Sequence, residues 1–220
     1  MVATCGWYLI LLVVAVLNVF RRKRMRTYSN CGKRYVSVTE IVALMYPFDG
    51  TSFNSWCRSK GINPGWVEEE SKRLGTKAHG WLENRFLNIQ DWADSRPRNK
   101  VEEAYLKTAD EVMFALNVKD MERVVYCDEF GYAGTYDMIL EDGTVVDVKT
   151  WGGWRGEYKR SSSKIKKVSV QLSMYAYAVG SEKIAVCVLL PDGGYEYEEL
   201  KIDDSWKEWI EKNRDKLKLP

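Results

Sequence analysis

The chain has 220 residues, enough for one domain with a hydrophobic core, and its 45% hydrophobic and 29% charged residues exclude a largely disordered protein. Its formal net charge of +2 argues neither for nor against nucleic-acid binding, so any surface for nucleic acid has to be a local patch. The five cysteines are scattered without a CxxC pair, which argues against a zinc ribbon or a disulfide framework and favours reduced thiols in the cytoplasm.

Residues 1–26 form a leader with a composition of its own. Residues 1–20 carry no charge and are almost wholly apolar from Trp7 onward, and a basic cluster follows at 21–26. This stretch is just long enough to span a membrane, and the basic cluster would keep the following domain on the cytoplasmic side. Alternatively, translation starts at Met25 and the apolar stretch is an error of gene prediction. A signal peptide is disfavoured because the basic cluster follows the apolar run.

The segment from 34 to 116 is predicted to be mainly helical. A short strand is expected at 34–38, and Ser37 starts a capping pattern for a helix that ends at Met45. Gly75 and Thr76 are expected to separate two helices, the first starting at Pro64 and the second ending near residue 88. Further helices are predicted at 52–60 and 100–116.

The second half of the chain is predicted to be rich in strands. Strands are expected at 122–127, 132–140, 144–150, 183–190 and 195–202. A loop at 151–163 leads to a helix at 164–180, and a last helix is expected at 205–217. This order predicts an α/β fold in which a mixed central sheet is flanked by helices.

The stretch 131–150 is predicted to be a hairpin that carries three charged residues of interest. Because side chains alternate along a strand, Asp147 and Lys149 point to the same face, and the hairpin can bring Asp137 beside them. Two carboxylates and an ammonium are costly to bury unless they bind something, such as a divalent metal and a phosphate. The alternative is a surface strand with an Asp–Lys pair, but both acids have apolar neighbours, which is unusual for a lone charge.

Two pairs of polar residues occur at helical spacing. His79 is the only histidine, and Glu83 shares its helix face, so both could point at a metal or Glu83 could orient His79. Taken alone, the pair is more simply explained as an exposed His–Glu pair. Gln171 and Tyr175 are also four residues apart and could grip a phosphate or a terminal nucleotide. The alternative for this second pair is a helix packed into the core, with Gln171 at its edge.

The loop after Lys149 combines basic and aromatic residues. Basic side chains attract phosphates, and aromatic rings between them can stack on unpaired bases. Because the loop follows Lys149 directly, it would rim the same site, although it could also be a mobile basic loop. We predict nucleic-acid contacts for Trp151, Trp154, Arg155, Lys159 and Arg160.

In this order, the motifs resemble those of PD-(D/E)XK nucleases of the RecB exonuclease type. In that group a helix carries G-x-x-x-H-x-x-x-E, which is similar to Gly75, His79 and Glu83. The following G-x-x-D, (D/E)-x-K and Q-x-x-x-Y motifs are similar to Gly134 with Asp137, Asp147 with Lys149, and Gln171 with Tyr175. The segment 37–41 looks like the S-V-T-x-I start of phage and mitochondrial single-strand exonucleases of this type. The resemblance covers about residues 34–200.

The resemblance implies a restriction-endonuclease-like core, placed here at 27–220, with Mg²⁺ or Mn²⁺ bound by His79, Asp137, Asp147 and the backbone carbonyl of Val148. It implies Lys149 as the catalytic lysine, and we include Glu83 with the catalytic residues. Gln171 and Tyr175 would support the substrate. No iron–sulfur cluster is expected, because the members that hold one have three cysteines near the C-terminus, where this chain has only Cys187.

The function implied by the resemblance is a metal-dependent deoxyribonuclease. We expect an exonuclease that acts on single-stranded DNA ends in replication, recombination or repair. Two alternatives stay open: a catalytically silent module that binds or protects DNA ends, and a restriction-type endonuclease.

Overall fold

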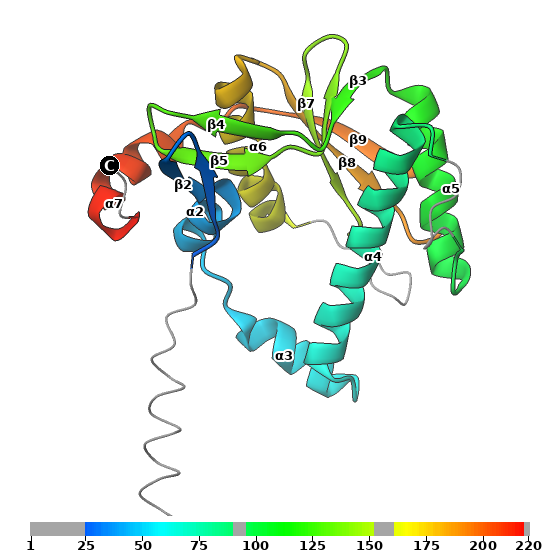
Figure 1. Ribbon diagram of the computed structural model, residues 1–220. Helices are drawn as coiled ribbons and strands as arrows, with labels where there is room; N and C mark the ends of the chain where they lie inside the picture. Colours follow the sequence, from blue (N-terminus) through cyan, green and yellow to red (C-terminus); the bar gives the residue numbers. More distant parts are fainter. Residues whose placement is uncertain (1–24, 90–95, 152–160, 218–220) are drawn as a thin grey trace, which may run out of the picture.

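The computed structural model describes residues 25–89, 96–151 and 161–217 (Figure 1). Nearly all of the leader at 1–26 lies outside the described residues, so both interpretations of it stay predictions. Among the helices that are described, none combines the length and the apolar character that crossing a membrane requires.

Four strands form a first mixed sheet in the described part of the chain, with the order β1–β2–β5–β4. Its two parallel neighbours are β2 and β5, and the other pairs are antiparallel. The strands are β1 (Thr27–Asn30), β2 (Lys33–Ser37), β4 (Val124–Cys127) and β5 (Tyr132–Thr135).

A second mixed sheet contains the part of the predicted hairpin from Met138 onward and has the order β3–β6–β7–β8–β9. Here β7 and β8 are parallel, and the other pairs are antiparallel. The strands are β3 (Val118–Met121), β6 (Met138–Leu140), β7 (Val145–Lys149), β8 (Ile184–Leu189) and β9 (Tyr195–Leu200).

The strand predicted at 132–140 is in fact two strands in different sheets. β5 ends at Thr135 and β6 begins at Met138, so the chain changes sheet at Tyr136 and Asp137. The sequence gives no warning of this break because the apolar residues continue through it. As a result, Asp137 lies at the point where the two sheets meet and not within a strand.

Helices cover both faces of the second sheet. Val145 and Val186 belong to a core that also contains residues of α2 (Val38–Met45), α6 (Ser162–Val179) and α7 (Ser205–Leu217). Val146 and Val148 belong to a separate core with residues of α4 (Pro64–Phe86) and α5 (Lys100–Ala115). The predicted fold class, an α/β fold with a mixed central sheet flanked by helices, is therefore confirmed, although the strands form two mixed sheets in place of the one expected.

The expected break at Gly75 does not occur, because α4 is continuous from Pro64 to Phe86. Its Leu74, Ala78 and Leu82 are buried, and this packing outweighs the low helix propensity of a single glycine, which costs about 1 kcal/mol. A Cβ at Gly75 would lie 3.5 Å from Oγ1 of Thr150, so the helix passes close to the end of β7. Figure 1 shows α4 extending beyond the sheets, where α3 (Gly50–Ser59) packs against it.

Candidate active site

The charged residues of β7 lie on the face of the sheet that α6 covers. Asp147 is only 2% exposed, and its Oδ2 lies 2.6 Å from Nζ of Lys149. On the other side, Nε2 of Gln171 in α6 donates to Oδ1 of Asp147 at 3.2 Å. The alternation of side chains along β7 thus places Asp147 and Lys149 on the same face. Gln171, the first residue of the Q-x-x-x-Y motif, fixes the position of the Asp147 carboxylate by its hydrogen bond.

Asp137, the residue that precedes β6, joins this pair. In the β6–β7 hairpin Met138 pairs with Val146, so extending the register by one residue puts Asp137 opposite Asp147. The backbone N–H of Val148 donates to Oδ2 of Asp137 at 2.7 Å, which holds the carboxylate at the end of β7. The two acids therefore lie at the same end of the hairpin, as the sequence predicts.

His79 approaches the same point from α4. Its Nε2 lies 2.9 Å from the carbonyl oxygen of Val148, and its Nδ1 lies 3.4 Å from Oδ1 of Asp137. Because a carbonyl oxygen can only accept a hydrogen bond, Nε2 carries the proton and Nδ1 faces the acids. The hydrogen bond from His79 thus connects α4 to β7, the strand that carries Asp147.

Glu122 is a member of the site that the sequence analysis did not identify. Its Oε1 lies 3.4 Å from Nδ1 of His79, and one ligand atom each from His79, Glu122 and Asp137 lie within 4.8 Å of one another. Glu122 belongs to no motif and precedes β4 by two residues, so no signal in the sequence marks it.

Glu83 lines the same site without contacting His79 in the way expected. A cleft of about 430 Å³ is lined by Gly75, Thr76, His79, Gly80, Glu83, Glu122 and Asp137. Glu83 therefore faces the cleft, but the carboxylates near the His79 ring belong to Glu122 and Asp137.

The electrostatics of the site reflect charges placed close together with little solvent. Burial raises the pKa of Asp147 to about 6, and the nearby Asp137 acts in the same direction while Lys149 opposes it. Burial would lower the pKa of His79, but Asp137 and Glu122 outweigh it and raise this pKa to about 9. For Lys149, burial is likewise outweighed by Asp147 and Asp137, so its pKa is raised. The carboxylates thus stabilise positive charge at this point.

The donor atoms suit a divalent cation. Carboxylate and carbonyl oxygens are the ligands that Mg²⁺ and Mn²⁺ prefer, and imidazole nitrogen is also a common ligand of transition metals. His79, Asp137, Asp147 and the carbonyl of Val148 all lie at the end of β7 or border it. The residues present therefore fit the metal that the resemblance implies.

Tyr175 is buried and packs against Gly134. Its side chain is 2% exposed, and a Cβ at Gly134 would lie 2.6 Å from Cε1 of the Tyr175 ring. The neighbours Leu172 and Ala176 are fully buried as well. Gly134 is thus required for the close approach of the ring, and Tyr175 supports the site from within the core.

We expect Gly134→Ala to lower the free energy of unfolding by about 1–3 kcal/mol, because the added methyl group overlaps the Tyr175 ring. Urea denaturation of the purified protein measures this change. In a Tyr175→Ala background the same substitution should cost much less, since the ring is gone. An equal cost in both backgrounds would show that the overlap is not the cause.

Only part of the predicted nucleic-acid contact loop can be placed. Trp151 lies two residues after the end of β7, and Nζ of Lys164 lies 5.6 Å from the centre of its ring. The other predicted contacts, Trp154, Arg155, Lys159 and Arg160, lie outside the described residues. A basic and an aromatic residue are thus neighbours just after β7, and nucleic-acid contacts of this loop stay a prediction.

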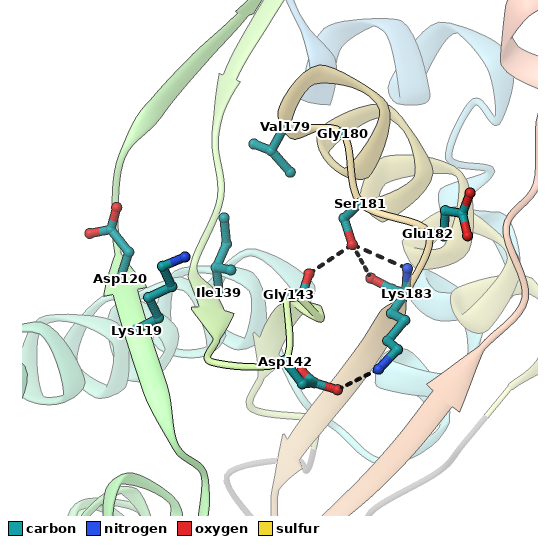
Figure 2. A pocket seen from close by; sticks show the side chains of 10 residues that line it. All are labelled: Lys119, Asp120, Ile139, Asp142, Gly143, Val179, Gly180, Ser181, Glu182 and Lys183. Atoms are coloured by element: carbon teal, nitrogen blue, oxygen red, sulfur yellow. Dashed lines mark hydrogen bonds and ion pairs between the residues drawn. The ribbon is translucent and has the colours of Figure 1, made fainter.

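A second cavity, of about 540 Å³, lies at the opposite end of the hairpin and is unrelated to these residues (Figure 2). Figure 2 shows Lys183 beside Asp142, whose Oδ2 is 2.9 Å from Nζ, and Oγ of Ser181 donating to the carbonyl of Gly143 at 2.7 Å. Because these groups are already paired with one another, they are less available to bind a ligand than the residues of the smaller cleft at His79.

Comparison with known proteins gives distant structural similarity only. No family model and no curated protein matches the chain. Among solved structures it is similar to SSO0001, with 15% identity and a TM-score of 0.45 over 96% of this chain and 85% of that chain. The alkaline exonuclease LHK-Exo from Laribacter hongkongensis gives 13% identity and a TM-score of 0.42, over 83% and 85% of the two chains. LHK-Exo in complex with dAMP gives 12% identity and a TM-score of 0.43, again over 83% and 85%. At these levels of identity and TM-score, function has to be argued from the side chains.

Proposed function

We propose that this chain is a nuclease of the PD-(D/E)XK type that hydrolyses phosphodiester bonds of DNA with a divalent metal. One observation carries the proposal: Asp137, Asp147 and Lys149 meet at one end of the β6–β7 hairpin, beside the only histidine. A buried cluster of acids with a lysine and a histidine is costly to maintain unless it binds a cation and an anion. A metal and a phosphate provide both charges.

The proposed metal is Mg²⁺ or Mn²⁺, and the proposed ligands are His79, Asp137, Asp147 and the carbonyl of Val148. When bound, such a metal polarises the phosphodiester and the attacking water. The chain's own groups hold these ligands in place. Gln171 fixes Asp147, and the N–H of Val148 fixes Asp137.

Lys149 is proposed to be the catalytic lysine. Its side chain is 27% exposed and its ammonium group lies 2.6 Å from Asp147, so it is both anchored and accessible to substrate. A fixed positive charge at this point can orient the attacking water and neutralise the charge that develops on the phosphate. Glu83, which lines the cleft, is the proposed additional acid.

The proposed substrate is DNA with free single-stranded ends, degraded by an exonuclease that spans residues 27–220. Support comes from Trp151 and Lys164, which lie together where the chain leaves β7 and can contact a base and a phosphate. Repair, recombination or replication is the proposed setting.

We expect the purified protein to degrade linear single-stranded DNA in Mg²⁺ or Mn²⁺ and to lose this activity in excess EDTA. Oligonucleotides labelled at the 5′ or the 3′ end, single- and double-stranded, followed over time, would give the polarity and the strand preference. Circular single-stranded DNA is the control for the mode of attack. Its cleavage would contradict an exonuclease and favour an endonuclease, and metal-independent binding without cleavage would favour a silent DNA-binding module.

A further inference from the structure

We infer that Glu122 is a further ligand of the cation at this site, a role that none of the motifs assigns to it. The inference rests on the proposed function, because it takes that cation as its premise. It adds a third carboxylate to the proposed ligands, besides those of Asp137 and Asp147.

The orientation of the His79 ring is the first observation behind this inference. Nε2 faces the carbonyl of Val148, so Nδ1 is the ring nitrogen that faces two carboxylates. Oε1 of Glu122 and Oδ1 of Asp137 each lie 3.4 Å from Nδ1. Two carboxylate oxygens this close together require a positive charge between them. One ligand atom each from His79, Glu122 and Asp137 lie within 4.8 Å of one another, which is close enough for one cation to contact all three.

The backbone at Glu122 provides a second, independent observation. Glu122 has φ +51°, in the left-handed region that glycine and asparagine favour and other residues seldom adopt. Its N–H donates to the carbonyl of Asp137 at 3.0 Å, so the residue is fixed to the backbone of a proposed ligand. The turn thus holds Glu122 beside Asp137, with its Oε1 3.4 Å from Nδ1 of His79.

The competing explanation is that Glu122 only forms an ion pair with a protonated His79. Both explanations predict a loss of stability when the carboxylate is removed, so stability does not separate them. The affinity for the metal separates them. If Glu122 only stabilises the protonated His79 ring, it opposes metal binding, because the metal has to displace the proton. If Glu122 is a ligand, it strengthens metal binding.

The test is a calorimetric titration of the full chain with MnCl₂, comparing the wild type with Glu122→Gln and Glu122→Asn. We expect both variants to bind Mn²⁺ about 10- to 100-fold more weakly. Asparagine tolerates the left-handed conformation, so the second variant keeps the turn even where glutamine disturbs it. Glu141→Gln makes the same change of charge at the exposed turn of the hairpin and should leave the affinity unchanged.

Unchanged or tighter Mn²⁺ binding by both variants, with DNA cleavage by the wild type intact, would overturn this inference and leave the proposed function standing. A wild-type chain that binds no Mn²⁺ would overturn both. Circular dichroism of each variant establishes that the protein is folded.

Discussion

Lys149→Met is expected to slow DNA cleavage by about 10²- to 10³-fold, because it removes the fixed positive charge from the site. The loss should appear in the rate at saturating substrate, since other groups are proposed to bind the DNA. Asp147→Asn is expected to cause a loss of at least this order, because it removes a proposed metal ligand that Lys149 and Gln171 hold in place. Single-turnover digestion of a labelled single-stranded oligonucleotide measures both effects.

The chain offers a matched control for these substitutions. Asp142 and Lys183 form the same kind of pair at the other end of the hairpin, exposed to solvent. Lys183→Met and Asp142→Asn should leave cleavage unchanged. Wild-type activity in Asp147→Asn would refute the assignment of the active site.

The second large effect is expected on stability, at a charge network that lies away from the cleft. Glu102 is 1% exposed and lies 2.7 Å from Nζ of Lys77, itself 4% exposed. It also forms an ion pair with Arg73 and accepts a hydrogen bond from the N–H of Arg98 at 2.8 Å. Glu102→Gln removes a buried negative charge that pairs with Lys77 and Arg73, so we expect a loss of about 3–5 kcal/mol in the free energy of unfolding.

The pH dependence of this loss follows from the pKa of Glu102. Burial opposes ionisation, but Lys77, the N–H of Arg98 and Arg73 outweigh it, so the pKa of Glu102 is lowered in the folded state. Its contribution is therefore complete above the unfolded value of about 4.3 and is lost as the pH falls through the folded value. The difference between the wild type and Glu102→Gln in urea denaturation should be constant near neutral pH and shrink below about pH 4.

A matched control lies on the surface of the same helix pair. Asp110 pairs with Arg85 between α4 and α5, but both side chains are more than a third exposed, at 41% and 49%. Asp110→Asn should therefore cost less than about 1 kcal/mol. A similar cost for both substitutions would show that burial of the Glu102 network contributes little.

Local patterns were sufficient to predict the elements whose apolar residues repeat regularly. α5 and β8 have such patterns and lie close to the predicted ranges. β1 and β3 are short, largely polar edge strands, so only their partners in the sheets define them. The continuity of α4 through Gly75 also depends on tertiary packing, because Leu74, Ala78 and Leu82 are buried against the sheet and α5.

The same distinction applies to the site. The alternation of side chains predicts that Asp147 and Lys149 share a face, and the hairpin register predicts that Asp137 lies opposite. Glu122 could not be predicted, because its position depends on a left-handed turn and on a histidine that is 43 residues away. The reason for a glycine at 134 is likewise visible only in the packed Tyr175 ring.

The hydrogen bond between His79 and Val148 joins residues that are 69 positions apart, whereas Asp137, Asp147 and Lys149 come from a single hairpin. Contacts that are local in the chain form faster than contacts that close a long loop. The acids and the lysine can thus assemble as soon as β6 and β7 pair, and the histidine is added only when α4 docks onto the sheet. Ligation by His79 would make the docked helix part of the metal-binding equilibrium, so an assembly intermediate that lacks it would hold metal weakly and leave nucleic acid intact.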